Sequence, residues 1–379
     1  MVPVMLVGVG LGGWVFASQG SVTCSGSLSA KYQCWNSAVS ELLVEDKIPQ
    51  ALQQLQIFSK QSPDFIQMCH AFAHQVGERA YTSFKAGERL SFTPDMQVCD
   101  FGFFHGFVTE FLFESGNRKE VGKEIGEFCT TMQGDDSNGQ KSYSRAACFH
   151  GVGHGSVIHH DVREWSDPVA IVQQTLSLCR QAAETDEDFV KCAGGAYNGI
   201  SYDENYAKKI DKQDPFKICR ELGADGVPEE CYANLASVVF NLTPDKTLQE
   251  AIDLAYRYTP SKYLQRTIST FAAMFARQLN TAAQAVPACL GLAPDLQEYC
   301  LGSYVSGLVQ AGTPDDKQKG AYAFCSSKVL PDEWHTHCFE AAFQQLADFW
   351  SKEKIQTSCV LAPLATQSCE AAWAVWSSL

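Results

Sequence analysis

Seven of the nine histidines in this chain lie between residues 70 and 160, at spacings that suit metal coordination. His70/His74 and His150/His154 are each four residues apart, so in a helix the two imidazoles of a pair share one face, one turn apart. Two imidazoles at this spacing can bind one metal ion. Any single buried histidine more often bonds to a backbone carbonyl, so the prediction depends on the whole cluster.

A second regularity ties these histidines to the cysteines. His105 and His154 each lie six residues after a cysteine, Cys99 and Cys148, and Asn198 occupies the same offset in the next segment. Equivalent positions of stacked helices lie about 10 Å apart, so side chains at those positions on neighbouring helices reach a common centre. We therefore predict one transition-metal site built from five histidines: His70, His74, His105, His150 and His154.

Two carboxylates are further candidate ligands. Glu78 continues the face of His74 by one more turn, and Asp100 directly follows Cys99. Imidazole suits zinc, iron and copper, and sequence does not separate them by geometry. We expect zinc before iron or copper. The chain has no HExxH, GxSxG, CxxCH or P-loop motif, so enzymatic activity stays open and no substrate is indicated.

Sixteen cysteines occur in the chain, most of them in pairs close in sequence, which predicts disulfides and an oxidising compartment. Zinc is the rival interpretation, but no CxxC is present. The predicted bridges are Cys24–Cys34, Cys129–Cys148, Cys179–Cys192, Cys219–Cys231, Cys289–Cys300, Cys325–Cys338 and Cys359–Cys369. Cys69 and Cys99 have no partner nearby, and they either bridge to each other, stay free or join the metal site.

The cysteines recur at intervals of 30 to 49 residues, with one double interval of 69, and amphipathic runs flank each acidic or Pro/Gly-rich loop. This periodicity predicts an all-α fold, an array of about ten αα-hairpin repeats stapled by disulfides, as an open solenoid or a closed toroid. The regular spacing of the predicted αα-hairpins resembles that of the Sel1-like and tetratricopeptide repeat families. Glycines concentrate in the second helices, where they serve either close helix packing or access for a ligand.

The first residues are uncharged and apolar. We expect residues 1–17 to be an export signal or a short N-terminal anchor, and residues 18–379 to be a single helical-repeat domain. Within that domain, 18–210 is the histidine-rich half and 211–379 a structural or binding half. The signal-like start and the paired cysteines together predict an extracytoplasmic protein, whether secreted, periplasmic or on the cell surface.

The charge balance limits the partners. A net charge of −14 and a pI near 5.1 argue against nucleic acid, and membrane contact is expected only through residues 1–17 if they are retained. The alternative to a metalloprotein is a non-catalytic scaffold whose concave face binds a protein, peptide or glycan. The confinement of the histidines to three of about ten units favours the metal, since a scaffold would spread polar features along its groove.

Overall fold

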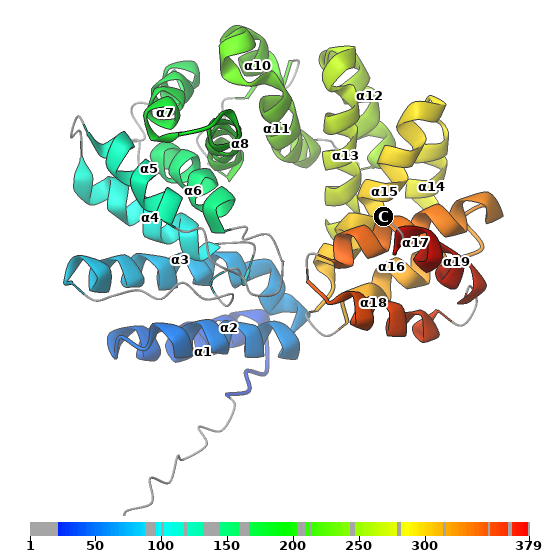
Figure 1. Cartoon of the computed structure of the whole chain (residues 1–379), viewed down its shortest axis with the longest axis horizontal. Coiled ribbons are helices and arrows are strands. Elements are labelled where there is room, and N and C mark those ends of the chain that lie inside the picture. The colour runs from blue at the N-terminus through cyan, green and yellow to red at the C-terminus, as the bar shows by residue number, and fades with distance from the viewer. Residues whose placement is uncertain are drawn as a thin grey trace, which may run out of the picture.

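In the computed structural model of the chain (Figure 1), the described residues are helical or lie in turns and loops, and none of them forms a strand. The ranges described are 22–87, 96, 98–99, 102–116, 120–131, 144–158, 167–202, 206, 210–211, 214–242, 247–278, 282–313, 316–347, 349–362 and 366–377. The predicted export segment 1–17 lies outside them. No helix within these ranges is both long and apolar enough to cross a membrane.

One series of helices packs in chain order, each against the next, and follows the arc seen in Figure 1. We call it the inner row. Its members are α3 (Pro63–Lys85), α4 (Gly102–Ser115), α6 (Ser144–Ile158), α8 (Asp186–Tyr202), α11 (Pro228–Leu242), α13 (Ser261–Gln278), α15 (Pro294–Ala311), α17 (His335–Leu346) and α19 (Thr366–Trp376).

A second series flanks the inner row, and its members pack on the inner helix that follows them. They are α2 (Ile48–Gln61), α5 (Val121–Thr131), α7 (Pro168–Ala182), α10 (Lys217–Leu222), α12 (Leu248–Tyr258), α14 (Ala282–Leu290), α16 (Gln318–Cys325) and α18 (Lys352–Ser358), the last through the 3-10 turn η5 (Cys359–Leu361). The first helix, α1 (Leu28–Val44), packs on α2 and α3. Two further 3-10 turns, η3 (Gly223–Gly226) and η4 (Asp332–Trp334), precede α11 and α17.

Local sequence explains where these helices begin and which face they bury. In α12 the Thr247 side chain accepts a hydrogen bond from the Glu250 backbone N–H, and the Glu250 carboxylate accepts one from the Thr247 N–H. Such a capping box satisfies two otherwise unpaired amides and stabilises a helix by about 1 kcal/mol. Leu248, Ile252 and Ala255 then recur on one buried face, which the 3.6-residue period predicts.

All sixteen cysteines are paired, and the seven predicted disulfides are present. Of the three alternatives that the sequence left open for Cys69 and Cys99, the structure has the bridge between them. Six bridges join the end of a flanking helix or its terminal turn to the inner helix that follows, so each one closes a short loop. Cys24–Cys34 instead holds the segment before α1 against that helix. Cys69–Cys99 links α3 to the residues just before α4, across a separation of 30 residues.

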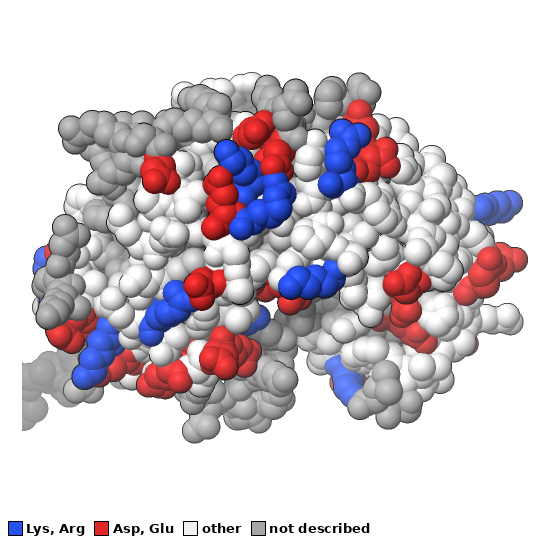
Figure 2. Space-filling model, turned by 90° about the horizontal axis from the view of Figure 1, so that it is seen from above, with Lys and Arg blue, Asp and Glu red and all other residues white. Residues whose placement is uncertain are grey.

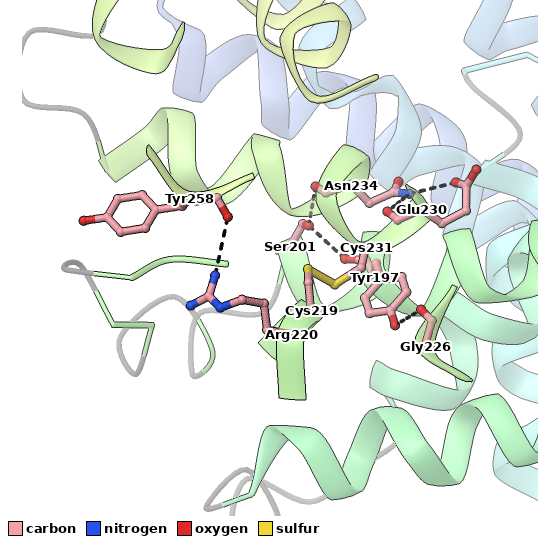
Figure 3. Close-up of a disulfide and its surroundings, with 9 residues drawn as sticks. All are labelled: Tyr197, Ser201, Cys219, Arg220, Gly226, Glu230, Cys231, Asn234 and Tyr258. Carbon is pink, nitrogen blue, oxygen red and sulfur yellow. Dashed lines mark hydrogen bonds between the residues drawn. A yellow bond between two sulfur atoms is a disulfide. The ribbon is translucent and has the colours of Figure 1, made fainter. Parts of the chain in front are cut away.

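Figure 3 shows one of these staples, Cys219–Cys231, between α10 and α11. The Tyr197 hydroxyl on α8 donates a hydrogen bond to the Gly226 carbonyl inside the stapled loop. Burial raises the pKa of Tyr197 well above its ordinary value, so the hydroxyl stays protonated and remains a donor. The loop is therefore held covalently to α11 and by a hydrogen bond to α8.

The buried apolar side chains form two clusters, which adjoin around α6 and α8. The N-terminal cluster includes Trp35, Phe58 and Phe65, whose ring centroids are 5.1 to 6.5 Å apart. At the surface, opposite charges lie side by side, and the described residues form no continuous basic area on the face seen in Figure 2. Lys31 exemplifies this pairing, since its Nζ lies 2.7 Å from an Asp64 carboxylate oxygen.

Candidate metal centre

The five predicted histidines come together from three successive helices of the inner row. His70 and His74 lie on α3, His105 on α4, and His150 and His154 on α6. The His105 ring centroid lies 5.0 Å from that of His70, 5.1 Å from that of His150 and 4.6 Å from that of His154. Residues up to 84 apart in sequence thus form one imidazole cluster centred on α4.

Glycines make this convergence sterically feasible. A β-carbon added at Gly106 on α4 would lie 2.0 Å from the His74 carbonyl oxygen, and one added at Gly195 on α8 would lie 1.8 Å from the His150 carbonyl oxygen. The α-hydrogens of both glycines therefore point at a neighbouring backbone, an approach at which Cα–H···O contacts form. Gly106 and Gly195 therefore serve close packing between helices, which is one of the two roles that the sequence left open.

Three of the imidazoles present nitrogens at a distance suited to one ion. His74 Nε2 lies 3.1 Å from His70 Nε2, and His105 Nδ1 lies 3.2 Å from the same atom. Zn–N bonds of about 2.05 Å at tetrahedral angles place ligand nitrogens about 3.3 Å apart. His70, His74 and His105 together form the three-residue group that can hold a metal ion, with one ligand atom from each within 4.8 Å of the others. We call this group the His triad.

Oxygen acceptors determine where two of the imidazoles carry their protons. His70 Nδ1 lies 3.0 Å from the Cys99 carbonyl oxygen, which can only accept, so Nδ1 donates and Nε2 carries the lone pair. His154 Nδ1 lies 3.1 Å from Asn198 Oδ1, and the same reasoning gives its Nε2 the lone pair. Metal-binding histidines are typically held in this way by a hydrogen bond from the other ring nitrogen.

The His70 lone pair is also approached by two nitrogens at once. A ring nitrogen offers one lone pair, so His70 Nε2 cannot accept full hydrogen bonds from both His74 and His105. A shared cation resolves this competition, because all three nitrogens can then direct lone pairs at one point.

Burial keeps four of the five imidazoles neutral near pH 7. It lowers the pKa of His74 to about 3 and that of His150 to about 4, with His70 adding repulsion in both cases and the Asn198 hydrogen bond opposing the effect at His150. Burial and then the neighbouring imidazoles hold the pKa of His105 and of His154 well below the ordinary value. Neutral imidazole is the form that binds metal ions.

Of the two carboxylate candidates, Glu78 lies among the described residues. Glu78 lies one turn beyond His74, is exposed, and does not belong to the His triad. Partial burial of its carboxyl group and the nearby Glu110 carboxylate raise the pKa of Glu78. Asp100 lies outside the described residues.

Sequence reasoning did not assign two of the groups that orient the imidazoles. Asn198 was in register with His154, and that shared offset was the available signal, but an asparagine gave no reason to expect an acceptor for a histidine. The Cys99 carbonyl had no signal at all, because any residue supplies a carbonyl. Its position follows from the Cys69–Cys99 bridge and from the left-handed backbone of Cys99, with φ of 59°.

No family model, curated protein or solved structure matches this chain.

Proposed function

We propose that this protein binds a transition metal ion, zinc before iron or copper, through His70, His74 and His105. The observation that carries the proposal is the convergence of His74 Nε2 and His105 Nδ1 on His70 Nε2, at 3.1 and 3.2 Å. Neutral imidazoles, ligand spacing and a fixed His70 tautomer all favour a cation at this point.

The two remaining histidines of the cluster adjoin the His triad. The His154 ring lies 4.6 Å from that of His105 and 5.5 Å from that of His74, and the His150 ring stacks on His105 at 5.1 Å. His154 is not among the residues whose ligand atoms already lie within 4.8 Å of one another. We infer that an ion bound by the His triad draws His154 in as the fourth ligand, through the Nε2 atom that Asn198 leaves with the lone pair. A site closed by four imidazoles stabilises or stores the metal, whereas catalysis requires an open position.

We also infer that the chain is a disulfide-stapled array of αα-hairpin repeats that works outside the cytoplasm. Support for the array comes from the ordered packing of the inner row and from the bridges that recur at equivalent helix ends. Support for the compartment comes from the complete pairing of sixteen cysteines, because disulfides persist in oxidising surroundings.

Metal analysis of the untagged protein tests the proposal. We expect close to one equivalent after reconstitution and dialysis, and a large loss in His74→Gln and His105→Gln, in which a non-ligating amide takes the place of each imidazole. His337→Gln is the matched control, because His337 is exposed and contacts Glu340 instead of the cluster. Co²⁺ absorption in place of zinc reports whether the ion is four-coordinate. Wild-type protein that stays below a tenth of an equivalent, with its disulfides intact, would overturn the proposal.

A further inference from the structure

A cavity of about 580 Å³ lies far along the inner row from the histidines, between α15, α17 and α19. Pockets of 300–1,000 Å³ are typical of small-ligand sites. Four aromatic residues, Tyr299, Phe324, Trp334 and Trp376, line it together with the carboxylates of Glu298 and Glu340. The metal proposed above plays no part in this cavity.

The charge of the lining selects one kind of ligand. Glu298 and Glu340 are the charged side chains among the described residues that line the cavity, and no lysine or arginine lines it there. His337 also lines it, and its Nδ1 lies 3.2 Å from a Glu340 oxygen. The chain as a whole carries a net charge of −14, which raises the local concentration of cations.

The aromatic rings point to the same chemistry. Tryptophan and tyrosine faces attract ammonium and guanidinium groups within about 6 Å of the ring centroid. This contact already occurs at this end of the molecule, since Lys354 Nζ lies 3.9 Å from the Trp350 centroid. Lys352 Nζ lies 5.4 Å from the Trp376 centroid, so Trp376 already carries one ammonium group and is left to cover the apolar stem of a ligand. A cation with an apolar stem would satisfy both the rings and the carboxylates.

A disulfide holds the wall of the cavity in place. Cys325–Cys338 closes the loop that carries Leu330 and Trp334, and Leu330, Trp334 and Cys338 all line the cavity. The His335 ring, which follows Trp334, bonds to the Leu330 carbonyl oxygen at 3.1 Å. A wall fixed in this way loses little conformational entropy when a ligand binds.

We propose that this cavity binds an organic cation, either a free polyamine or the lysine and arginine side chains of a basic peptide. The two carboxylates neutralise its charge, and Tyr299, Trp334 and Trp376 cover its apolar stem. A neutral glycan would also stack on the tryptophans and donate hydrogen bonds from its hydroxyl groups to the two carboxylates, but it would leave their charge unneutralised.

Calorimetry and intrinsic tryptophan fluorescence test this on the full, metal-loaded chain, with spermine, hexa-arginine and maltohexaose as probes. We expect spermine or hexa-arginine to bind at one site per chain, the tighter of the two identifying the source of the cation. The double variant Glu298→Gln/Glu340→Gln should weaken that binding at least about tenfold. Metal content and melting temperature should not change, which separates this result from any failure of the metal site.

Glu333→Gln is the matched control, because it removes one negative charge from the neighbouring turn η4 without lining the cavity. Binding to this variant should stay within about twofold of wild type, since Glu333 does not line the cavity and its exposed charge is screened by solvent and salt. Three results would overturn the proposal. They are no binding of either cation at millimolar concentration, an equal loss in Glu333→Gln, and maltohexaose binding that is unaffected by the double variant.

Discussion

Replacing Gly106 with alanine should separate α3 from α4 and dismantle the His triad. The added β-carbon would lie 2.0 Å from the His74 carbonyl oxygen, about 1.3 Å short of the roughly 3.3 Å at which carbon and oxygen normally meet. The obstacle is backbone, which cannot rotate away, so the helices must move apart by about that amount. Metal sites tolerate errors of only about 0.2 Å in ligand distance, so His105 would no longer share an ion with His70 and His74.

The expected values follow from this displacement. Overpacking costs about 1–3 kcal/mol of unfolding free energy, and the better helix propensity of alanine offsets about 0.5–1 kcal/mol. Metal affinity should fall by at least about a hundredfold, because a displaced ligand loses its bond outright. Denaturant melts of the metal-free protein measure the change in unfolding free energy, and competition with a chelator measures the change in metal affinity.

Gly302→Ala is the matched control, since Gly302 also lies in a helix of the inner row. A β-carbon there meets its nearest neighbour, the Ala341 β-carbon, at 3.7 Å, an ordinary contact. This variant should gain up to about 1 kcal/mol of stability and keep its metal affinity. If Gly106→Ala is as stable as wild type and binds metal equally well, then close packing does not position the imidazoles and the reasoning fails.

Three further outcomes are expected. Unfolding free energy of the metal-free protein should fall as pH drops from 6.5 towards 4, by about 1.4 kcal/mol per pH unit for each of His74 and His150, because folding lowers the pKa of His74 to about 3 and that of His150 to about 4, so the unfolded chain binds the protons. A flat profile between pH 6.5 and 4.5 in chemical melts would contradict this. Cys69→Ser/Cys99→Ser should weaken metal binding about tenfold or more, because it releases the carbonyl that orients His70. Cys219→Ser/Cys231→Ser should instead cost about 2–3 kcal/mol of unfolding free energy and leave metal affinity unchanged. Equal metal affinities of the two double variants in chelator competition would show that the Cys69–Cys99 bridge does not orient His70. Asn198→Ala should lower metal affinity about tenfold and Asn198→Asp should restore it, since a carboxylate also accepts from an imidazole N–H. Equal metal affinities of the two variants in metal titrations would show that Asn198 does not orient a metal ligand.

Much of the site was predictable because its chemistry depends on short sequence distances. An HxxxH pair places two imidazoles on one helix face whatever surrounds the helix, and a cysteine pair 10 to 19 residues apart can close only a local loop. The helical period and the cysteine rhythm thus predicted the all-α fold, the local bridges and the five histidines that assemble. The roles of the N-terminal segment and of Asp100 remain predictions, because both lie outside the described residues.

Only the tertiary structure decided which nitrogens face one another and what orients them. The contacts of His70 with His105 and of His154 with Asn198 span 35 and 44 residues, so they depend on how far apart neighbouring helices lie and how each is rotated. Those distances are set where glycine backbones touch, as at Gly106 and His74. A glycine in the sequence is compatible with a turn, a ligand or a helix crossing, and only the neighbouring backbone, brought close by the rest of the fold, determines which it is.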